Sequence, residues 1–181
     1  MRKDLDKKII ITPQPVLMIG TYDENGIPNM MNAAWGCQIE ADQVLISLGE
    51  HKTTDNLKIK KEFTLSFATS DTVKISDYFG METGRKINKI EKAQVHVEKA
   101  KYVDAPIVLE YPLTVECRVV SFNDGILIGQ VVNANADEKI LTDGKVDLEK
   151  LKPIIFDATN NTYRVVGSVV GKAFSDGLEM K

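Results

Sequence analysis

The chain has 181 residues, of which 43% are hydrophobic and 27% are charged, and its formal net charge is −3. These values are typical of one globular domain with a substantial core, and acids interspersed among the lysines and arginines exclude the concentrated basic surface of a nucleic-acid-binding protein. No apolar run approaches the roughly 20 residues of a membrane helix and the amino terminus lacks the apolar region of a signal peptide, so we expect a single domain over residues 1–181, in the cytoplasm.

The first half of the chain is predicted to be mostly strand, with short helices between the strands. The expected elements are, in chain order, a strand over residues 15–23, a strand over 30–41, a strand over 44–48, a helix over 53–61, a strand over 63–67, a helix over 71–79 and a polar loop over 82–93. We expect Thr53, Thr54 or Asp55 to cap the first helix. Asp71 is expected to cap the second helix and Gly80 to end it.

The strand predicted over 30–41 has two different faces. Alternation places one set of apolar side chains together, namely Met31, Ala33, Trp35, Cys37 and Ile39. The opposite face is small and polar, and consists of Asn32, Ala34, Gly36 and Gln38. A core strand would carry bulky side chains there, so this pattern favours a flat surface against which a large planar ligand lies. Trp35 is expected to pack inside the barrel and to contact such a ligand mainly through its backbone.

The Lys52 region, just after the third predicted strand, suits a phosphate group. Lys52 offers a positive charge, Thr53 and Thr54 offer hydroxyl groups, and the start of a helix offers free backbone amides. Ser47 could add another hydroxyl at the end of the preceding strand. An ordinary capped helix with an exposed Lys52 explains the same residues, and their spacing alone favours neither interpretation.

The second half of the chain repeats the strand-rich pattern. Residues 113–119 alternate between apolar and polar, and an Asp-Gly turn returns the chain through 126–132, which together predict a hairpin. A short helix or turn is expected over 147–151, and a last strand lies within 162–174. Most connections are too short for parallel crossovers, so about six or seven strands are expected to form an antiparallel barrel with a few short helices.

Other motifs in the chain do not support a nucleotide-binding loop, a zinc site or a hydrolase. The segment over 167–173 resembles a phosphate-binding loop, but its glycines are one residue too close and Ala173 replaces the magnesium-binding Ser or Thr. His51 and His96 are too few for a three-histidine zinc site, and His96 is expected on the solvent face of a strand. Cys37 and Cys117 are predicted to be reduced and buried. A triad hydrolase has no nucleophile elbow here.

Three motifs then follow one another in a recognisable order. They are Asn29-Met30-Met31-Asn32-Ala33-Ala34-Trp35-Gly36, then Lys52-Thr53-Thr54-Asp55-Asn56-Leu57, then Asp77-Tyr78-Phe79-Gly80 with Thr83-Gly84-Arg85-Lys86-Ile87-Asn88-Lys89-Ile90. Their order and spacing resemble the flavoredoxin branch of the flavin reductase-like proteins, over roughly residues 10 to 175. The third motif departs from the family pattern at three positions, which are Thr83, Asn88 and Ile90.

The resemblance implies a fold, a cofactor and an assembly. The fold is a mainly β, antiparallel Greek-key split β-barrel of about six strands with a few short peripheral helices, and it binds FMN as a homodimer with flavin sites near the subunit interface. The implied contacts to the flavin ring or ribityl chain are Asn32, Ala33, Ala34 and Trp35. The implied phosphate-end residues are Ser47, Leu48, Lys52, Thr53, Thr54 and Asn56. Lys86 and Lys89 are expected to approach the flavin or the incoming nicotinamide.

The function implied by the resemblance is that of an oxidoreductase in which the flavin carries the chemistry. Reducing equivalents would pass from NADH or NADPH through FMN to free flavin, ferric iron or a redox protein. No side chain is then expected to act as a nucleophile, and no metal is expected. Two alternatives remain, an FMN-containing electron carrier that does not itself oxidise NAD(P)H, and a non-enzymatic module that binds flavin or haem.

Overall fold

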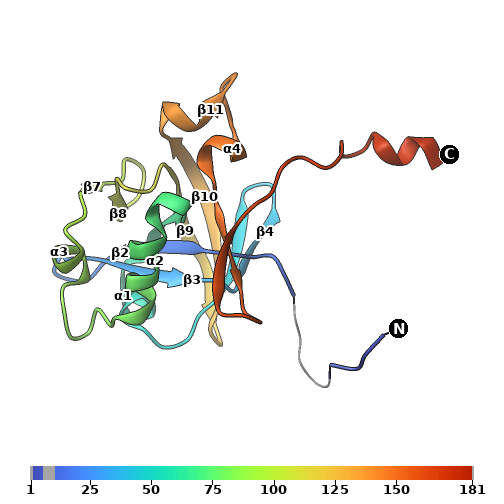
Figure 1. The fold of residues 1–181 in the computed structure, drawn as a ribbon. Coiled ribbons are helices and arrows are strands. Elements are labelled where there is room, and N and C mark those ends of the chain that lie inside the picture. The colour runs from blue at the N-terminus through green and yellow to red at the C-terminus, as the bar shows by residue number, and fades with distance from the viewer. Residues whose placement is uncertain (1, 6–10, 181) are drawn as a thin grey trace.

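A seven-stranded antiparallel sheet curls into a half-barrel, and short helices cover one side of it (Figure 1). The structure is a computed structural model that describes residues 2–5 and 11–180. In chain order, the strands of this sheet are β2 (Leu17–Tyr22), β3 (Pro28–Ala33), β4 (Gly36–Glu40), β5 (Gln43–Ser47), β6 (Glu62–Phe67), β9 (Leu113–Asn123) and β10 (Ile126–Ala136). Their order in the sheet is β3-β2-β6-β9-β10-β5-β4, which confirms the predicted mainly β split barrel.

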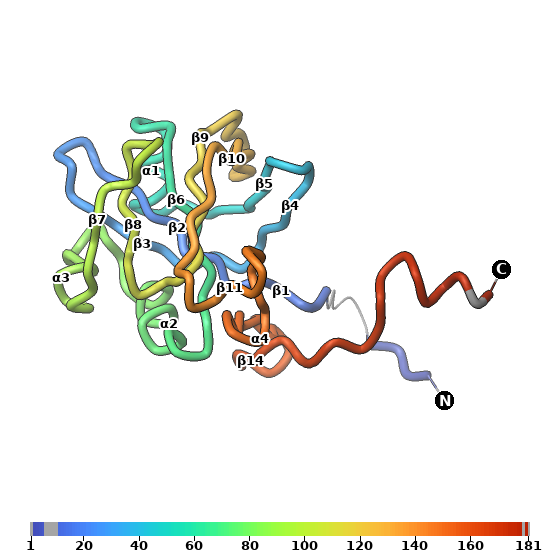
Figure 2. The backbone as a smooth tube through the Cα atoms, turned by 90° about the horizontal axis from the view of Figure 1, so that it is seen from above, coloured from blue at the N-terminus to red at the C-terminus, as the bar shows by residue number. Residues whose placement is uncertain are grey.

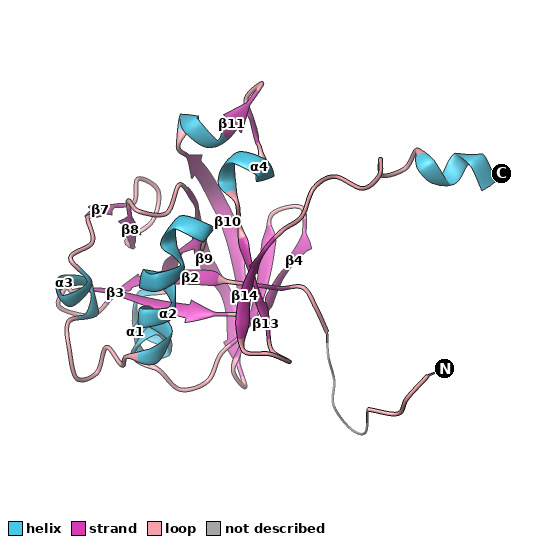
Figure 3. Ribbon diagram, in the orientation of Figure 1, coloured by secondary structure: helices cyan, strands magenta, loops and turns pink. Residues whose placement is uncertain are grey.

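Helices and small sheets complete the molecule (Figure 3). The helices are α1 (Lys52–Lys60), α2 (Val73–Met81), α3 (Lys89–Ala93) and α4 (Leu148–Leu151), with 3-10 turns η1 (Ser70–Thr72), η2 (Glu138–Ile140) and η3 (Asp176–Met180). The strands of the small sheets are β1 (Gln14–Pro15), β13 (Ile154–Asp157) and β14 (Thr162–Val165), then β7 (Val97–Lys99) with β8 (Pro106–Val108), and β11 (Leu141–Thr142) with β12 (Lys145–Val146). None of the helices in the described ranges has both the length and the apolar character to cross a membrane.

Strand β2 is buried on both faces, which explains its uninterrupted apolar sequence. Leu17 and Ile19 belong to the cluster inside the curled sheet. Val16, just before the strand, and Met18 belong to a second cluster, on the side that carries α2 and α3. The alternation of a strand sends neighbouring side chains to opposite faces, so β2 joins the two cores.

The prediction of a single strand over residues 30–41 is wrong, because two strands, β3 and β4, occupy this range. Strand β3 ends at Ala33 and pairs with β2, whereas β4 begins at Gly36 and pairs with β5, at the opposite end of the sheet order. The Gly36 amide donates to the Ala34 carbonyl at 3.1 Å, which turns the chain across the split. A Cβ on Gly36 would lie 2.7 Å from Leu17 Cδ1 and 3.1 Å from the Leu45 carbonyl oxygen, so a side chain here would require its neighbours to shift.

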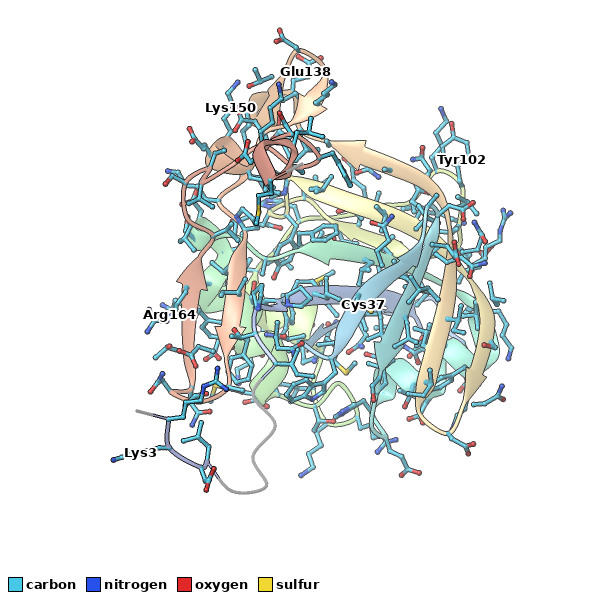
Figure 4. The ribbon with its side chains drawn as sticks, turned by 90° about the vertical axis from the view of Figure 1, so that its right-hand side faces the viewer. Lys3, Cys37, Tyr102, Glu138, Lys150 and Arg164 are labelled. Atoms are coloured by element: carbon cyan, nitrogen blue, oxygen red, sulfur yellow. The ribbon has the colours of Figure 1, made fainter. Side chains whose placement is uncertain are left out.

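The break changes which of the side chains that follow it are buried. Met31 and Ala33 are buried as predicted, but Trp35 is 55% exposed and Ile39 is also exposed. Cys37, predicted to be buried, is exposed as well, and Figure 4 labels it on β4. Period-two alternation holds only while the backbone stays in one strand, and the turn resets it. Cys117 is buried as predicted, and burial raises its thiol pKa to about 12.

Helices α1 and α2 agree with the sequence except at their ends. Helix α1 begins at Lys52 and its N-cap is His51, so none of Thr53, Thr54 and Asp55 is the cap. Asp71 lies in the 3-10 turn before α2 and does not cap that helix. Helix α2 also continues through Gly80 to Met81. The polar loop predicted over 82–93 is wrong at its end, because Lys89–Ala93 form helix α3, which Asn88 caps and which buries Lys89 and Ile90. The predicted hairpin and the predicted short helix near 147–151 are present, as β9–β10 and α4.

Candidate functional site

A cleft follows the free edge of β3, where helices α1 and α2 and the loop over residues 82–88 meet the strand. It consists of an inner cavity of ≈ 200 Å³ and an outer cavity of ≈ 380 Å³. The two cavities share Asn32, Gly80 and Met81 in their linings, so they lie next to each other along the strand. Together they reach the size of typical small-molecule sites, roughly 300–1,000 Å³. We call this space the β3 cleft.

The inner cavity has a net positive charge because two lysine side chains and one carboxylate, that of Glu82, line it. Lys52 is the first residue of α1, and its Nζ lies 3.2 Å from Asp23 Oδ2. Lys89 is only 3% exposed, and its Nζ donates to the Phe79 carbonyl at 2.9 Å. Burial lowers the pKa of Lys89 to about 8, while the negative charge of Glu82 acts in the opposite direction. Among the described residues Lys89 makes no other hydrogen bond, which leaves two of its protons for a ligand.

Thr53 presents a hydroxyl proton to the same cavity. Its Oγ1 accepts a hydrogen bond from Asn29 Nδ2 at 2.8 Å, and both residues are buried. A hydroxyl group that accepts one bond still has its own proton to donate. The amides in the first turn of α1 also lack partners within the helix, and they carry the positive end of the helix dipole. The inner cavity therefore combines the donors that an anion requires.

Two glycines, Gly84 and Gly80, allow close approaches of the backbone that shape the cleft. A Cβ on Gly84 would overlap Asn29 Oδ1 and would lie 3.4 Å from Lys52 Cγ. A Cβ on Gly80 would lie 3.3 Å from Asn32 Cβ, on the strand that α2 packs against. Glycine at these positions lets the loop over 82–88 and helix α2 approach β3 closely.

The outer cavity has an aromatic wall and a fixed polar pair. Phe156 on β13 and Tyr163 on β14 pack with ring centroids 5.9 Å apart, and both line the cavity. Tyr163 Oη donates to Asp77 Oδ1 at 2.8 Å. Burial and the neighbouring Asp77 carboxylate raise the pKa of Tyr163 to about 12. The outer cavity can thus hold a flat, largely apolar group beside a phenol that stays neutral.

Part of the predicted set of site residues lines this cleft. Those residues are Asn32, Ala34, Lys52, Thr53 and Lys89. Asn32 Nδ2 donates to the Ser76 carbonyl of α2 at 3.0 Å, which fixes the side chain between strand and helix.

The other predicted site residues lie elsewhere. Ala33 and Leu48 are core side chains, and Ser47 and Lys86 are exposed outside the cleft lining. Thr54 and Asn56 are buried and hydrogen-bonded within the protein, to His51 and Thr21 respectively. Trp35 lines a separate groove beside β13.

Sequence reasoning missed several residues that line the cleft, which are Asn29, Met31, His51, Asp77, Met81, Phe156 and Tyr163. The position of Asn29, three residues before Asn32 and at the start of the same motif, was the one local signal for its role. Phe156 and Tyr163 reach the cleft only because β13 and β14 fold back beside β1, and no short-range pattern predicts that. Among the described residues, no group of three or more His, Cys, Asp or Glu side chains could hold a metal ion.

Comparison with known proteins gives a consistent result. A family model described as "Flavin reductase like domain" matches residues 11–153. The flavoredoxin of Desulfovibrio vulgaris (Miyazaki F) is 30% identical with a TM-score of 0.94, covering 98% of this chain and 100% of its own. A flavoredoxin from Methanosarcina acetivorans is 26% identical with a TM-score of 0.91 and full coverage of both chains, 100% each.

A third structure is similar in fold. It is an FMN-binding domain of a flavin reductase-like enzyme from Shewanella baltica OS155, which is 17% identical with a TM-score of 0.79. The alignment covers 88% of this chain and 89% of that one. At this identity the likeness concerns the split-barrel fold alone.

Proposed function

The chain belongs to the flavin reductase-like domain family, and from that premise we propose that it is an FMN-binding oxidoreductase that takes reducing equivalents from NADH or NADPH and delivers them to free flavin, ferric iron or a redox protein. The β3 cleft carries the proposal, because it is cationic at its inner end and aromatic at its outer end. That polarity corresponds to a phosphate at one end of a ligand and a flat ring at the other. The names of the similar proteins, two flavoredoxins and an FMN-binding domain, support the same ligand.

The residues of the cleft fit FMN. Lys52, Thr53 and Lys89 would hold the phosphate together with the amides of the first turn of α1, since each offers a donor to the inner cavity. Asn32 and Ala34 would lie along the ring or the ribityl chain, where small side chains leave room. When bound, FMN supplies hydride and single-electron transfer.

The protein contributes binding, orientation and exclusion of water. The packing of Gly84 against Asn29 closes the inner end, so that charges there act in a poorly hydrated space and attract an anion more strongly. The Tyr163 proton is held by Asp77, and the raised pKa keeps the phenol neutral near pH 7. The Tyr163 phenol therefore adds no charge beside the ring, and the charge of the outer wall is that of the Asp77 carboxylate.

We also propose that the working form is a homodimer. The resemblance to flavoredoxins supports it, and so do exposed apolar side chains at the outer end of the cleft and in the separate groove beside β13. Trp35 and Met81 are both large, apolar and exposed in the single chain. A second copy would cover such side chains.

Two measurements on the purified protein test this function. The absorption spectrum is expected to show the bands of an oxidised flavin, and stopped-flow mixing with NADH and NADPH is expected to bleach them within seconds. Lys86→Ala serves as the control, because Lys86 is exposed outside the cleft. A colourless protein that does not take up FMN would overturn the cofactor assignment. A yellow protein that neither nucleotide bleaches would overturn the reductase activity and favour an electron carrier.

A further inference from the structure

The last segment of the chain leaves the body of the protein. We call residues 166–180 the C-terminal arm, which follows β14 and projects outward before ending in η3 (Figures 1 and 2). Its large apolar side chains are exposed, with Val170 and Phe174 entirely so, and Val169, Leu178 and Met180 largely so. Among the described residues, hydrogen bonds from 167 onward stay within the arm, such as Lys172 N to Asp176. Exposure of these apolar side chains to water is energetically unfavourable.

The body carries an apolar groove that the arm of the same chain leaves open. The groove has a volume of ≈ 900 Å³, the largest of the four described cavities, and it lies between the N-terminal segment and the β13–β14 hairpin. Ile11, Trp35 and Ile155 form its apolar surface, and Thr159 and Arg164 lie among its polar residues. Figure 4 looks onto this side of the molecule, with Arg164 labelled on β14. We call it the arm groove.

The arm groove and the β3 cleft lie on opposite faces of one thin sheet. In the β13–β14 register, Ile155 pairs with Arg164, and both line the groove. The next pair, Phe156 with Tyr163, lines the outer cavity of the cleft. Adjacent residues of a strand face opposite sides, so a segment that fills the groove supports the wall of the cleft from behind.

We propose that the C-terminal arm of each chain lies in the arm groove of a second copy. This deepens the homodimer proposed above and rests on it. The arm and the groove are both apolar and belong to the same chain, and no residue of the arm lines the groove in the part of the chain that the structure describes. In a dimer with a twofold axis, each copy places its arm in the groove of the other, so both arms and both grooves are covered. Val169, Val170 and Phe174 would cover Ile11, Trp35 and Ile155 of the other copy.

The first test weakens the arm without touching the body. In the full-length chain, Val169→Ser, Val170→Ser and Phe174→Ser together are expected to raise the dimer dissociation constant by at least about a hundredfold, because three apolar side chains lose their burial. The single chain should fold as before, since these side chains are largely or fully exposed. Ile59→Ser, at an exposed apolar position on α1, is the matched control and is expected to leave the constant unchanged. Sedimentation equilibrium gives all three constants.

The second test locates the arm. In a Cys37→Ser background, Phe174→Cys and Thr159→Cys are combined in one chain and treated with a short bismaleimide. Cys117 is buried, and the raised pKa of its thiol keeps it unreactive. Exchange of arms predicts a product of dimer mass on a denaturing gel. The pair Phe174→Cys with Lys58→Cys is the control and should give none, because Lys58 lies on α1, away from the groove.

Each other outcome overturns the proposal. A link within one chain, seen as a shifted band of monomer mass, would place the arm in its own groove. A monomeric wild-type protein would remove the second copy, and a dimer unaffected by the triple serine variant would place the interface elsewhere. FMN content is measured in the same samples, so a failure of arm exchange is distinguishable from a failure of the cofactor assignment.

Discussion

Thr53 and Thr54 are neighbours at the start of α1, but their hydroxyl groups have different roles. Thr53 Oγ1 accepts from Asn29 at 2.8 Å and lines the inner cavity. Thr54 Oγ1 accepts from the His51 amide at 2.9 Å and donates to the His51 carbonyl at 2.8 Å. Both hydrogen-bonding capacities of Thr54 are thereby directed to the backbone, away from any ligand.

Replacement of each threonine by valine separates ligand binding from helix capping. Thr53→Val is expected to weaken FMN binding by about tenfold or more, because a hydrogen bond to a charged group contributes roughly 1.5–3 kcal/mol. Thr54→Val is expected to lower the free energy of unfolding by about 1 kcal/mol through loss of the cap bond, and to leave FMN affinity nearly unchanged. Fluorescence titration and urea unfolding measure the two effects. The reverse pattern would place the phosphate at Thr54.

Lys89 gives FMN binding a pH dependence with a definite sign. The pKa of Lys89 in the ligand-free protein is about 8, below the value of 10.5 for an exposed lysine. Above pH 8 the side chain loses its charge, so affinity for an anionic phosphate is expected to fall by up to about tenfold per pH unit. Titrations between pH 7 and 9.5 are the measurement. Lys89→Met should be weaker throughout and should lack this dependence.

The lowered pKa of Lys89 affects folding stability in the direction opposite to its effect on FMN affinity. Between the folded pKa of about 8 and the unfolded value of 10.5, the unfolded chain binds more protons at Lys89 than the folded one. The free energy of unfolding without ligand therefore gains a contribution that rises with pH across that window. Stability rising while FMN affinity falls would identify a single buried lysine as the common cause. An FMN affinity that is constant from pH 7 to 9.5 would remove Lys89 from the phosphate site.

At the scale of elements, the loop between α2 and α3 closes the inner cavity by backbone approach. Gly84→Ala would push a methyl group into Oδ1 of the buried Asn29, whose other amide atom, Nδ2, donates a hydrogen bond to Thr53 Oγ1. We expect FMN affinity to fall by about tenfold, because the donor geometry at Thr53 is lost. Gly49→Ala is the matched control in the loop before α1, where a Cβ would lie 3.5 Å from the His51 ring, an ordinary contact. Equal FMN affinities of the two variants would show that Asn29 does not orient Thr53.

The element scale also shows where sequence reasoning succeeds and where it fails. Strand β6, helix α1 and the β9–β10 hairpin follow from alternation, helix start signals and an Asp-Gly turn, all of which are local. The break at Ala34–Trp35 does not, because its residues continue the apolar alternation of β3. What breaks the strand is the pairing of β3 and β4 with different partners, which local sequence does not record.

For the whole molecule, the residues of the cleft come from parts of the chain that lie far apart in the sequence. Asn29 and Asn32 lie on β3, Lys52 and Thr53 on α1, Lys89 on α3, and Tyr163 on β14. The first three parts appear as sequence motifs, and the family resemblance brings them together. Tyr163 was missed because β14 belongs to a small sheet whose position depends on the complete fold.

The two ends of the cleft predict how the whole molecule responds to ligands. FMN at about a hundred times its dissociation constant is expected to stabilise the folded state by about 2.7 kcal/mol, which raises the melting temperature by roughly 5–11 °C for a chain of this length. Riboflavin has the same ring without the phosphate, so at equal concentration its shift should be much smaller. In Lys89→Met the FMN and riboflavin shifts should converge, because the inner cavity has lost a cation that holds the phosphate. Differential scanning calorimetry gives the melting temperatures. Equal shifts for the two ligands in the wild-type protein would show that the inner cavity does not bind phosphate, and that binding depends on the outer cavity alone.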